Sequence, residues 1–166
     1  MKRSAWISML LSVALVAAWP VLAADAGHYL LGNLKARTPG AVQPGLLLMG
    51  GGDRNFDALR WFMKKAGNGH IVVLRASQGG EIGEEFFNEV GGIQSVETFV
   101  FSDREQSNDP KLLAALKRAD GIFLAGGDQS RYVRFWRGTP VAAALDAHVR
   151  DGKPLGGTSA GLAMQG

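Results

Sequence analysis

The chain of 166 residues contains no cysteine and only three histidines. The lack of cysteine excludes disulfide bonds, a cysteine nucleophile and thiolate metal sites. No basic patch is interleaved with aromatic residues, which argues against nucleic acid as a partner. The glycine-rich segments have the spacing of neither a P-loop nor a dinucleotide fingerprint, so no cofactor is expected. The composition, 46% hydrophobic and 20% charged, is that of an ordinary globular protein.

Residues 1–24 have the pattern of a secretory signal peptide. Lys2 and Arg3 precede an apolar run from Ala5 to Ala18, and small residues offer cleavage after Ala23 or Ala24. An uncleaved membrane anchor is the less favoured alternative, because the run is short for a span and no basic cluster follows it. We expect export to a bacterial periplasm or beyond, without membrane contact after cleavage. Loss of the two basic residues would lower the formal net charge from +3 to +1.

The rest of the chain alternates between strand and helix patterns. Residues 25–45 are rich in glycine and proline and are expected to form an N-terminal lead-in. Strands are expected at residues 46–49, 71–74, 96–101, 121–125 and 154–155. Helices are expected over residues 56–66 and 81–90, from Pro110, around residues 132–136 and over 139–150. This alternation predicts one α/β domain over residues 46–166, a three-layer αβα arrangement with a mostly parallel sheet.

Three glycine-rich turns follow predicted strands, at Gly50–Asp53, Gly126–Gln129 and Gly157–Gly161. In open sheets of this kind, ligands bind at the carboxyl ends of the strands. We therefore expect the three turns to converge on one face of the molecule.

The last of these turns, Gly157-Thr158-Ser159-Ala160-Gly161, has the G-x-S-x-G form of a nucleophile elbow. Ser159 is the candidate nucleophile, and the backbone N–H of Ala160 is a candidate donor to an oxyanion. The turn at Gly127 and Asp128 is expected to supply a second donor if its strand lies beside the elbow strand. The alternative is that Ser159 only caps the following helix.

The other two turns offer substrate contacts as well as structural roles. Asp128 is expected to cap the next helix, while Gln129 could hydrogen-bond a substrate carboxylate or amide. Gly51 and Gly52 are expected to line the pocket, and Asp53 either reaches a basic group of the substrate or caps a helix. Four glutamates crowd the helix over residues 81–90 and are interpreted as a solvated face, so no metal site is assigned. They are Glu81, Glu84, Glu85 and Glu89.

A serine nucleophile needs a base, and none of the three histidines is well placed. His70 begins a strand and should lie roughly 20 Å from the active face. His148 comes near the end of a helix that runs toward the same wrong edge, and His28 lies in the lead-in, where it cannot be placed.

From Leu46 to Gly166 the chain resembles the cyanophycinase-like serine peptidases, a family that includes aspartyl dipeptidases and whose fold is related to class I glutamine amidotransferases. The matching features are the first glycine turn, the segment from Gly121 to Gln129 and the segment from Pro154 to Gly161. The resemblance implies Ser159 as nucleophile, backbone oxyanion donors near Gly127, Asp128 and Ala160, and a substrate contact for Gln129. It implies peptide substrates in which aspartate supplies the scissile carbonyl, including the β-linked aspartyl-arginine units of cyanophycin.

The resemblance also implies a catalytic histidine and an acid after the elbow, which residues 162–166 do not supply. Two hypotheses follow: an exported serine peptidase represented here by its N-terminal part, or a non-catalytic binding protein or inactive truncated fragment. A glutamine amidotransferase is disfavoured, because that chemistry uses cysteine. The last strand is expected to be an unprotected sheet edge that invites aggregation or a homodimer.

Overall fold

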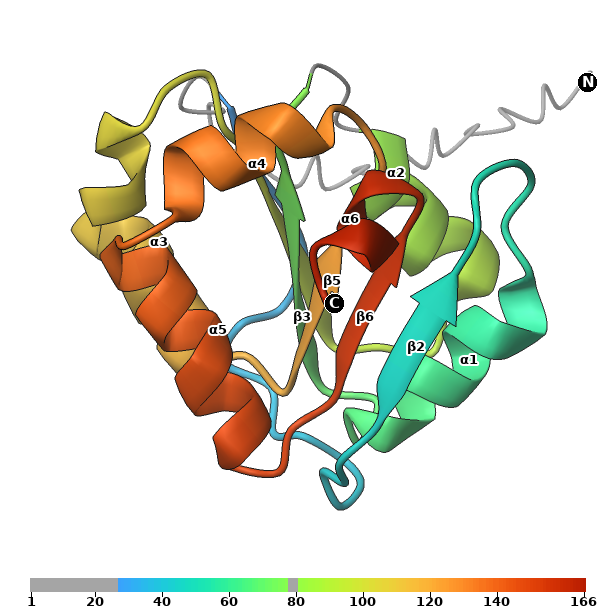
Figure 1. The fold of residues 1–166 in the computed structure, drawn as a ribbon. Helices are drawn as coiled ribbons and strands as arrows, with labels where there is room; N and C mark the ends of the chain where they lie inside the picture. The colour runs from blue at the N-terminus through green and yellow to red at the C-terminus, as the bar shows by residue number, and fades with distance from the viewer. Residues whose placement is uncertain (1–26, 78–80) are drawn as a thin grey trace, which may run out of the picture.

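The computed structural model describes residues 27–77 and 81–166, so the predicted signal peptide lies outside the described residues. A six-stranded sheet runs through its centre in the order β1-β4-β3-β5-β6-β2 (Figure 1). All strand pairs are parallel except β1 with β4, which is antiparallel. The strands are β1 (His28–Gly32), β2 (Leu46–Met49), β3 (His70–Arg75), β4 (Ser95–Val100), β5 (Gly121–Leu124) and β6 (Leu155–Thr158).

Helices cover both faces of the sheet, which confirms the predicted three-layer αβα class (Figure 1). One face packs against α1 (Phe56–Lys65), α2 (Glu81–Glu84) and the π-helical turn η1 (Glu85–Val90). The other packs against α3 (Pro110–Arg118), α4 (Gln129–Trp136) and α5 (Pro140–Arg150). A short 3-10 turn, η2 (Glu105–Asn108), precedes α3, and α6 (Ala160–Ala163) follows β6 directly.

The central strand β3 shows how the sequence builds two cores. Ile71 and Val73 join the cluster beneath α1 and η1, while Val72 and Leu74 join the cluster beneath α3 and α4. Side chains alternate across a strand, so a continuous apolar run is the pattern of a strand buried on both faces. This burial places β3 in the interior of the sheet. Because β3 is parallel to β5, its carboxyl end lies on the same side as the turn that follows β5.

Three expectations from the sequence need correction. The lead-in contains a strand, β1, which pairs with β4. β6 is not an exposed edge, because it lies between β5 and β2. The N-cap of α1 is Asn55 rather than Asp53: its side chain accepts from the N–H groups of Asp57 and Ala58. The cap lies two residues further along the chain, so Asp53 does not have the capping role.

Among the described residues, no helix combines the length and the apolarity needed to cross a bilayer.

Candidate active site

The elbow strand β6 is flanked by the two strands that carry the other glycine turns, β5 and β2. The N–H of Ser159 donates to the carbonyl of Met49 at 3.0 Å, and Thr158 Oγ1 donates to the carbonyl of Gly50 at 2.7 Å. A Cβ atom on Gly51 would lie 3.6 Å from Ser159 Oγ, and one on Gly126 would lie 3.9 Å from it. The structure therefore brings all three turns together around one hydroxyl group.

Ser159 has a backbone conformation that few side-chain-bearing residues adopt. Its φ is 53° and its ψ is −116°, and among the described residues only Asn68 is another non-glycine residue with positive φ. Such a conformation costs on the order of 1–3 kcal/mol and persists only where its surroundings enforce it. Ser159 occupies the N-cap position of α6, yet its side chain makes no capping hydrogen bond and the residue is exposed. In this conformation the residue is exposed to solvent, and its hydroxyl does not cap the helix.

The glycines around Ser159 are required by close packing. A Cβ atom on Gly157 would lie 2.5 Å from the carbonyl oxygen of Gly161. A Cβ atom on Gly161 would overlap the carbonyl oxygen of Leu124 at the end of β5. Only a residue without a side chain allows strand and helix to approach this closely. The G-x-S-x-G pattern is thus explained by sterics on both sides of the serine.

Two elements near the elbow carry the main-chain N–H groups of the candidate oxyanion hole. Ala160 begins α6, and N–H groups in the first turn of a helix have no carbonyl partner within that helix. Gly127 has a φ of 146°, and a Cβ atom there would lie 2.5 Å from Ser77 Oγ in the loop after β3. Because β5 pairs with β6, the turn of Gly127 and Asp128 lies on the neighbouring strand end, as the oxyanion interpretation requires.

The side chain of Asp128 is committed to α4. Its Oδ1 accepts from the N–H of Ser130 at 2.8 Å and from Ser130 Oγ at 2.6 Å. These hydrogen bonds lower the pKa of Asp128 below its usual value. Its carboxylate is a helix cap, so only its backbone is available as a donor. Gln129, at the first position of α4, is exposed.

The family model of peptidase family S51 matches residues 46–166. The chain belongs to peptidase family S51. The match begins at β2 and includes all three glycine turns.

Curated relatives of this S51 chain are cyanophycinases. It is 33% identical to those of Trichormus variabilis and a Nostoc species over 145 residues, which is 81% of this chain and 48% of each relative. It is 38% identical over 88 residues to the cyanophycinase of Synechococcus elongatus, covering 52% of this chain and 27% of the relative. The chain therefore spans about half the length of the first two relatives. A solved peptidase from an acI-B1 actinobacterium is 17% identical with a TM-score of 0.47, covering 70% of this chain and 53% of its own.

None of the three histidines of this S51 chain is available to Ser159. His70 begins β3 and contacts Ser95 Oγ at 2.7 Å and the carbonyl of Ala36 at 2.9 Å. His148 is buried in α5, with its Nε2 3.0 Å from the carbonyl of Pro154, immediately before β6. His28, in β1, contacts Glu97 at 3.2 Å. β1 is at the opposite edge of the sheet from β2, and the other two contacts lie at the amino ends of strands, away from the elbow.

The acidic helix is not only a solvated face. Glu85 forms a bidentate ion pair with Arg54, in the loop between Asp53 and α1. Sequence reasoning missed this pair, because its members are 31 residues apart and neither belongs to a recognisable motif. The described residues hold no group of three or more histidine, aspartate or glutamate side chains placed to bind a metal ion.

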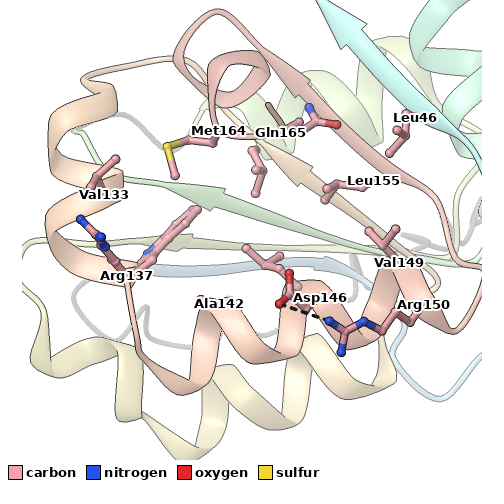
Figure 2. Close-up of a pocket in the computed structure, with 13 residues that line it drawn as sticks. Leu46, Val133, Arg137, Ala142, Asp146, Val149, Arg150, Leu155, Met164 and Gln165 are labelled. Atoms are coloured by element: carbon pink, nitrogen blue, oxygen red, sulfur yellow. Dashed lines mark ion pairs between the residues drawn. The ribbon is translucent and has the colours of Figure 1, made fainter.

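A cavity of about 640 Å³ opens beside the elbow without including Ser159 (Figure 2). Its lining comes from α4, α5, the strands β2, β5 and β6, and the two residues after α6, and most of it is apolar. Leu46, Leu155, Val149 and Met164 point into it, with Asp146 and Arg150 paired at its rim (Figure 2). The cavity lies on the sheet face that packs against α4 and α5, whereas Ser159 follows the carboxyl end of β6.

Proposed function

We propose that this chain carries the nucleophile of an exported serine peptidase that hydrolyses aspartyl peptide bonds, including the β-aspartyl-arginine bond of cyanophycin. The observation that carries this proposal is the positive φ of Ser159, combined with a hydroxyl that caps nothing and lies between two glycine turns. The substrate class follows from the resemblance and from the cyanophycinases among the relatives.

The proposed reaction is acyl transfer. Ser159 Oγ attacks the aspartyl carbonyl carbon while a base takes its proton, and the carbonyl oxygen becomes an oxyanion. The N–H groups of Ala160 and of the turn at Gly127 and Asp128 stabilise that negative charge. The C–N bond then breaks, the leaving amine takes up the proton, and water hydrolyses the acyl-enzyme. Gln129, Gly51, Gly52 and Asp53 are proposed to contact the peptide.

The base is the part of this reaction that the described residues do not supply. In the resembling family it is a histidine that follows the elbow in the chain, together with an acid. We expect the 166-residue chain by itself to have a serine that is positioned but weakly activated. A non-catalytic peptide-binding protein is the second candidate, and the separation of all three histidines from Ser159 is the observation that favours it.

A fluorophosphonate probe with added imidazole tests the nucleophile directly. Imidazole in solution can act as a base, so the labelling rate should rise with its concentration at pH values where it is neutral. Mass spectrometry should locate the label on Ser159. Ser159→Ala should abolish labelling, while Ser102→Ala, which removes an exposed loop hydroxyl, should leave it unchanged. Labelling that survives in Ser159→Ala would refute the assignment.

The substrate class is tested by hydrolysis in the same buffer. β-Aspartyl-arginine should release arginine in the presence of imidazole, and the asparaginyl analogue should not. Release from both peptides at equal rates would leave Ser159 as a nucleophile but reject the aspartyl specificity.

A further inference from the structure

Arg75, the last residue of β3, has a side chain without a recorded partner. Its Nε–H is enclosed by protein and donates no hydrogen bond to any described residue, and the residue as a whole is only partly exposed. The terminal nitrogens of the guanidinium are not among the enclosed, unpaired atoms, so they reach solvent. Leaving a buried charged donor unpaired is costly, and such a group in a native structure calls for an explanation.

The other partly buried arginines of the described chain each have an interaction partner. Arg54 forms its ion pair with Glu85, and the guanidinium of Arg131 lies 5.9 Å from the ring centroid of Phe135. Arg75 has neither kind of partner. Burial raises the pKa of Tyr132 to about 12, and the nearby positive charge of Arg75 acts in the opposite direction. Tyr132 therefore stays neutral, and its hydroxyl donates to the carbonyl of Ala125, so it is no counter-ion for Arg75.

The sheet register places Arg75 close to the elbow. Leu74 pairs with Leu124, and Leu124 pairs with Gly157, so Arg75 stands in one row with Ala125 and Thr158. Neighbouring strands are about 4.8 Å apart, which puts the backbone of Arg75 roughly 10 Å from that of the elbow. Two residues further on, Ser77 is in contact with Gly127 of the proposed oxyanion turn. The end of β3 therefore forms part of the rim around Ser159.

We infer that Arg75 is a specificity-determining residue that binds the free carboxylate of the aspartyl unit whose other carboxyl group is attacked by Ser159. This inference rests on the proposed function, since it takes the bound peptide from there. A guanidinium fits a carboxylate with two parallel hydrogen bonds, and a partly desolvated guanidinium binds it more strongly than one in water. In an α-linked peptide this carboxylate is the side chain, and in a β-linked peptide it is the α-carboxylate.

Peptide binding tests the inference without requiring turnover. Calorimetric titrations would use the full 166-residue chain carrying Ser159→Ala, with aspartyl-alanine, β-aspartyl-arginine and asparaginyl-alanine as ligands. We expect both aspartyl peptides to bind more tightly than the asparaginyl peptide. Adding Arg75→Met should weaken the aspartyl peptides about 10- to 100-fold and leave the asparaginyl peptide unchanged. Arg75→Lys should restore part of the difference, and Arg131→Met should preserve all of it.

Thermal unfolding separates recognition from a structural role. Because Nε makes no hydrogen bond, Arg75→Met should unfold at the same temperature as the parent chain or higher. The inference is overturned if Arg75→Met weakens all peptides equally, weakens none, or lowers the unfolding temperature by several degrees. It is also overturned if the parent binds aspartyl and asparaginyl peptides alike or binds neither. These readings do not depend on Ser159 being a nucleophile, so failure of the labelling experiment is a separate result.

Discussion

At the scale of single residues, the elbow depends most on Gly161. A methyl group at this position would overlap the carbonyl oxygen of Leu124, which belongs to the backbone at the end of β5 and cannot rotate away. We predict that Gly161→Ala destabilises the fold by at least about 3 kcal/mol, near the upper range for overpacking. Urea unfolding measures the loss. Gly50→Ala is the matched control, because its Cβ would meet nothing within 4 Å. Equal stability of Gly161→Ala and the parent would contradict the observed packing.

His148 makes stability depend on pH. Burial lowers its pKa to about 4 from an ordinary value of 6.5, so the folded chain keeps the imidazole neutral where the unfolded chain protonates it. Between these two values the unfolded state binds more protons, so stability must fall as the pH falls from about 6.5 to about 4. The full shift corresponds to about 3 kcal/mol.

A non-titrating substitution isolates this contribution. His148→Gln keeps a donor for the Pro154 carbonyl but carries no proton that depends on pH. We predict that the stability gap between parent and variant narrows or reverses when urea unfolding is repeated at pH 4.5 instead of pH 7.5. An unchanged gap at both pH values would show that His148 titrates normally in the folded chain.

At the scale of elements, the Arg54–Glu85 pair joins the first glycine turn to η1. Both side chains are mostly buried, with exposed fractions of 31% and 13%, and the contact uses two nitrogens and two oxygens. A bidentate, partly buried pair should couple more strongly than a surface pair. We predict a coupling energy of about 1–2 kcal/mol from a double-mutant cycle of Arg54→Met and Glu85→Gln. If the losses of stability in the two single variants add up to that of the double variant, the ion pair does not stabilise the turn.

The elements that sequence patterns predicted are those whose signals are local. The apolar runs of β3 and β5, Pro110 after Asp109 and the helical spacing of α1 each identify an element within a few residues. β1 was missed because it is half-exposed and is defined by pairing with β4, more than 60 residues away. The predicted helix over residues 81–90 is one continuous segment, but its second half takes the wider π-helical winding, which no sequence pattern marked.

At the scale of the whole molecule, the convergence of the glycine turns was predictable from topology alone. Parallel strands joined by helices bring their carboxyl ends to one edge, and the structure has all three turns there. The strand order was not predictable, because no residue pattern within β2 indicates that it pairs with β6. The sequence could not predict either that the Nε of Arg75 has no hydrogen-bond partner among the described residues, because this depends on how the whole fold packs.

The strand order also leaves β2 as an edge with an exposed apolar face. Leu46 is 55% exposed and Leu48 is 59% exposed. Leu46 also lines the cavity of about 640 Å³. Unpaired edges with apolar side chains invite association with other chains. The exposed edge is therefore β2, not the last strand as the sequence suggested, and we expect any association through a sheet edge to involve β2.

Charged substitutions on β2 test whether this surface drives self-association. We predict that Leu46→Lys combined with Leu48→Glu lowers both the binding of a hydrophobic dye and the concentration-dependent growth in mass seen by light scattering. The stability should change by less than about 1 kcal/mol, because both side chains are already largely in water. Tyr29→Lys on β1, at the other edge and 44% exposed, is the matched control and should change neither measurement. If the β1 variant reduces association as much as the β2 variant does, the association is not specific to β2.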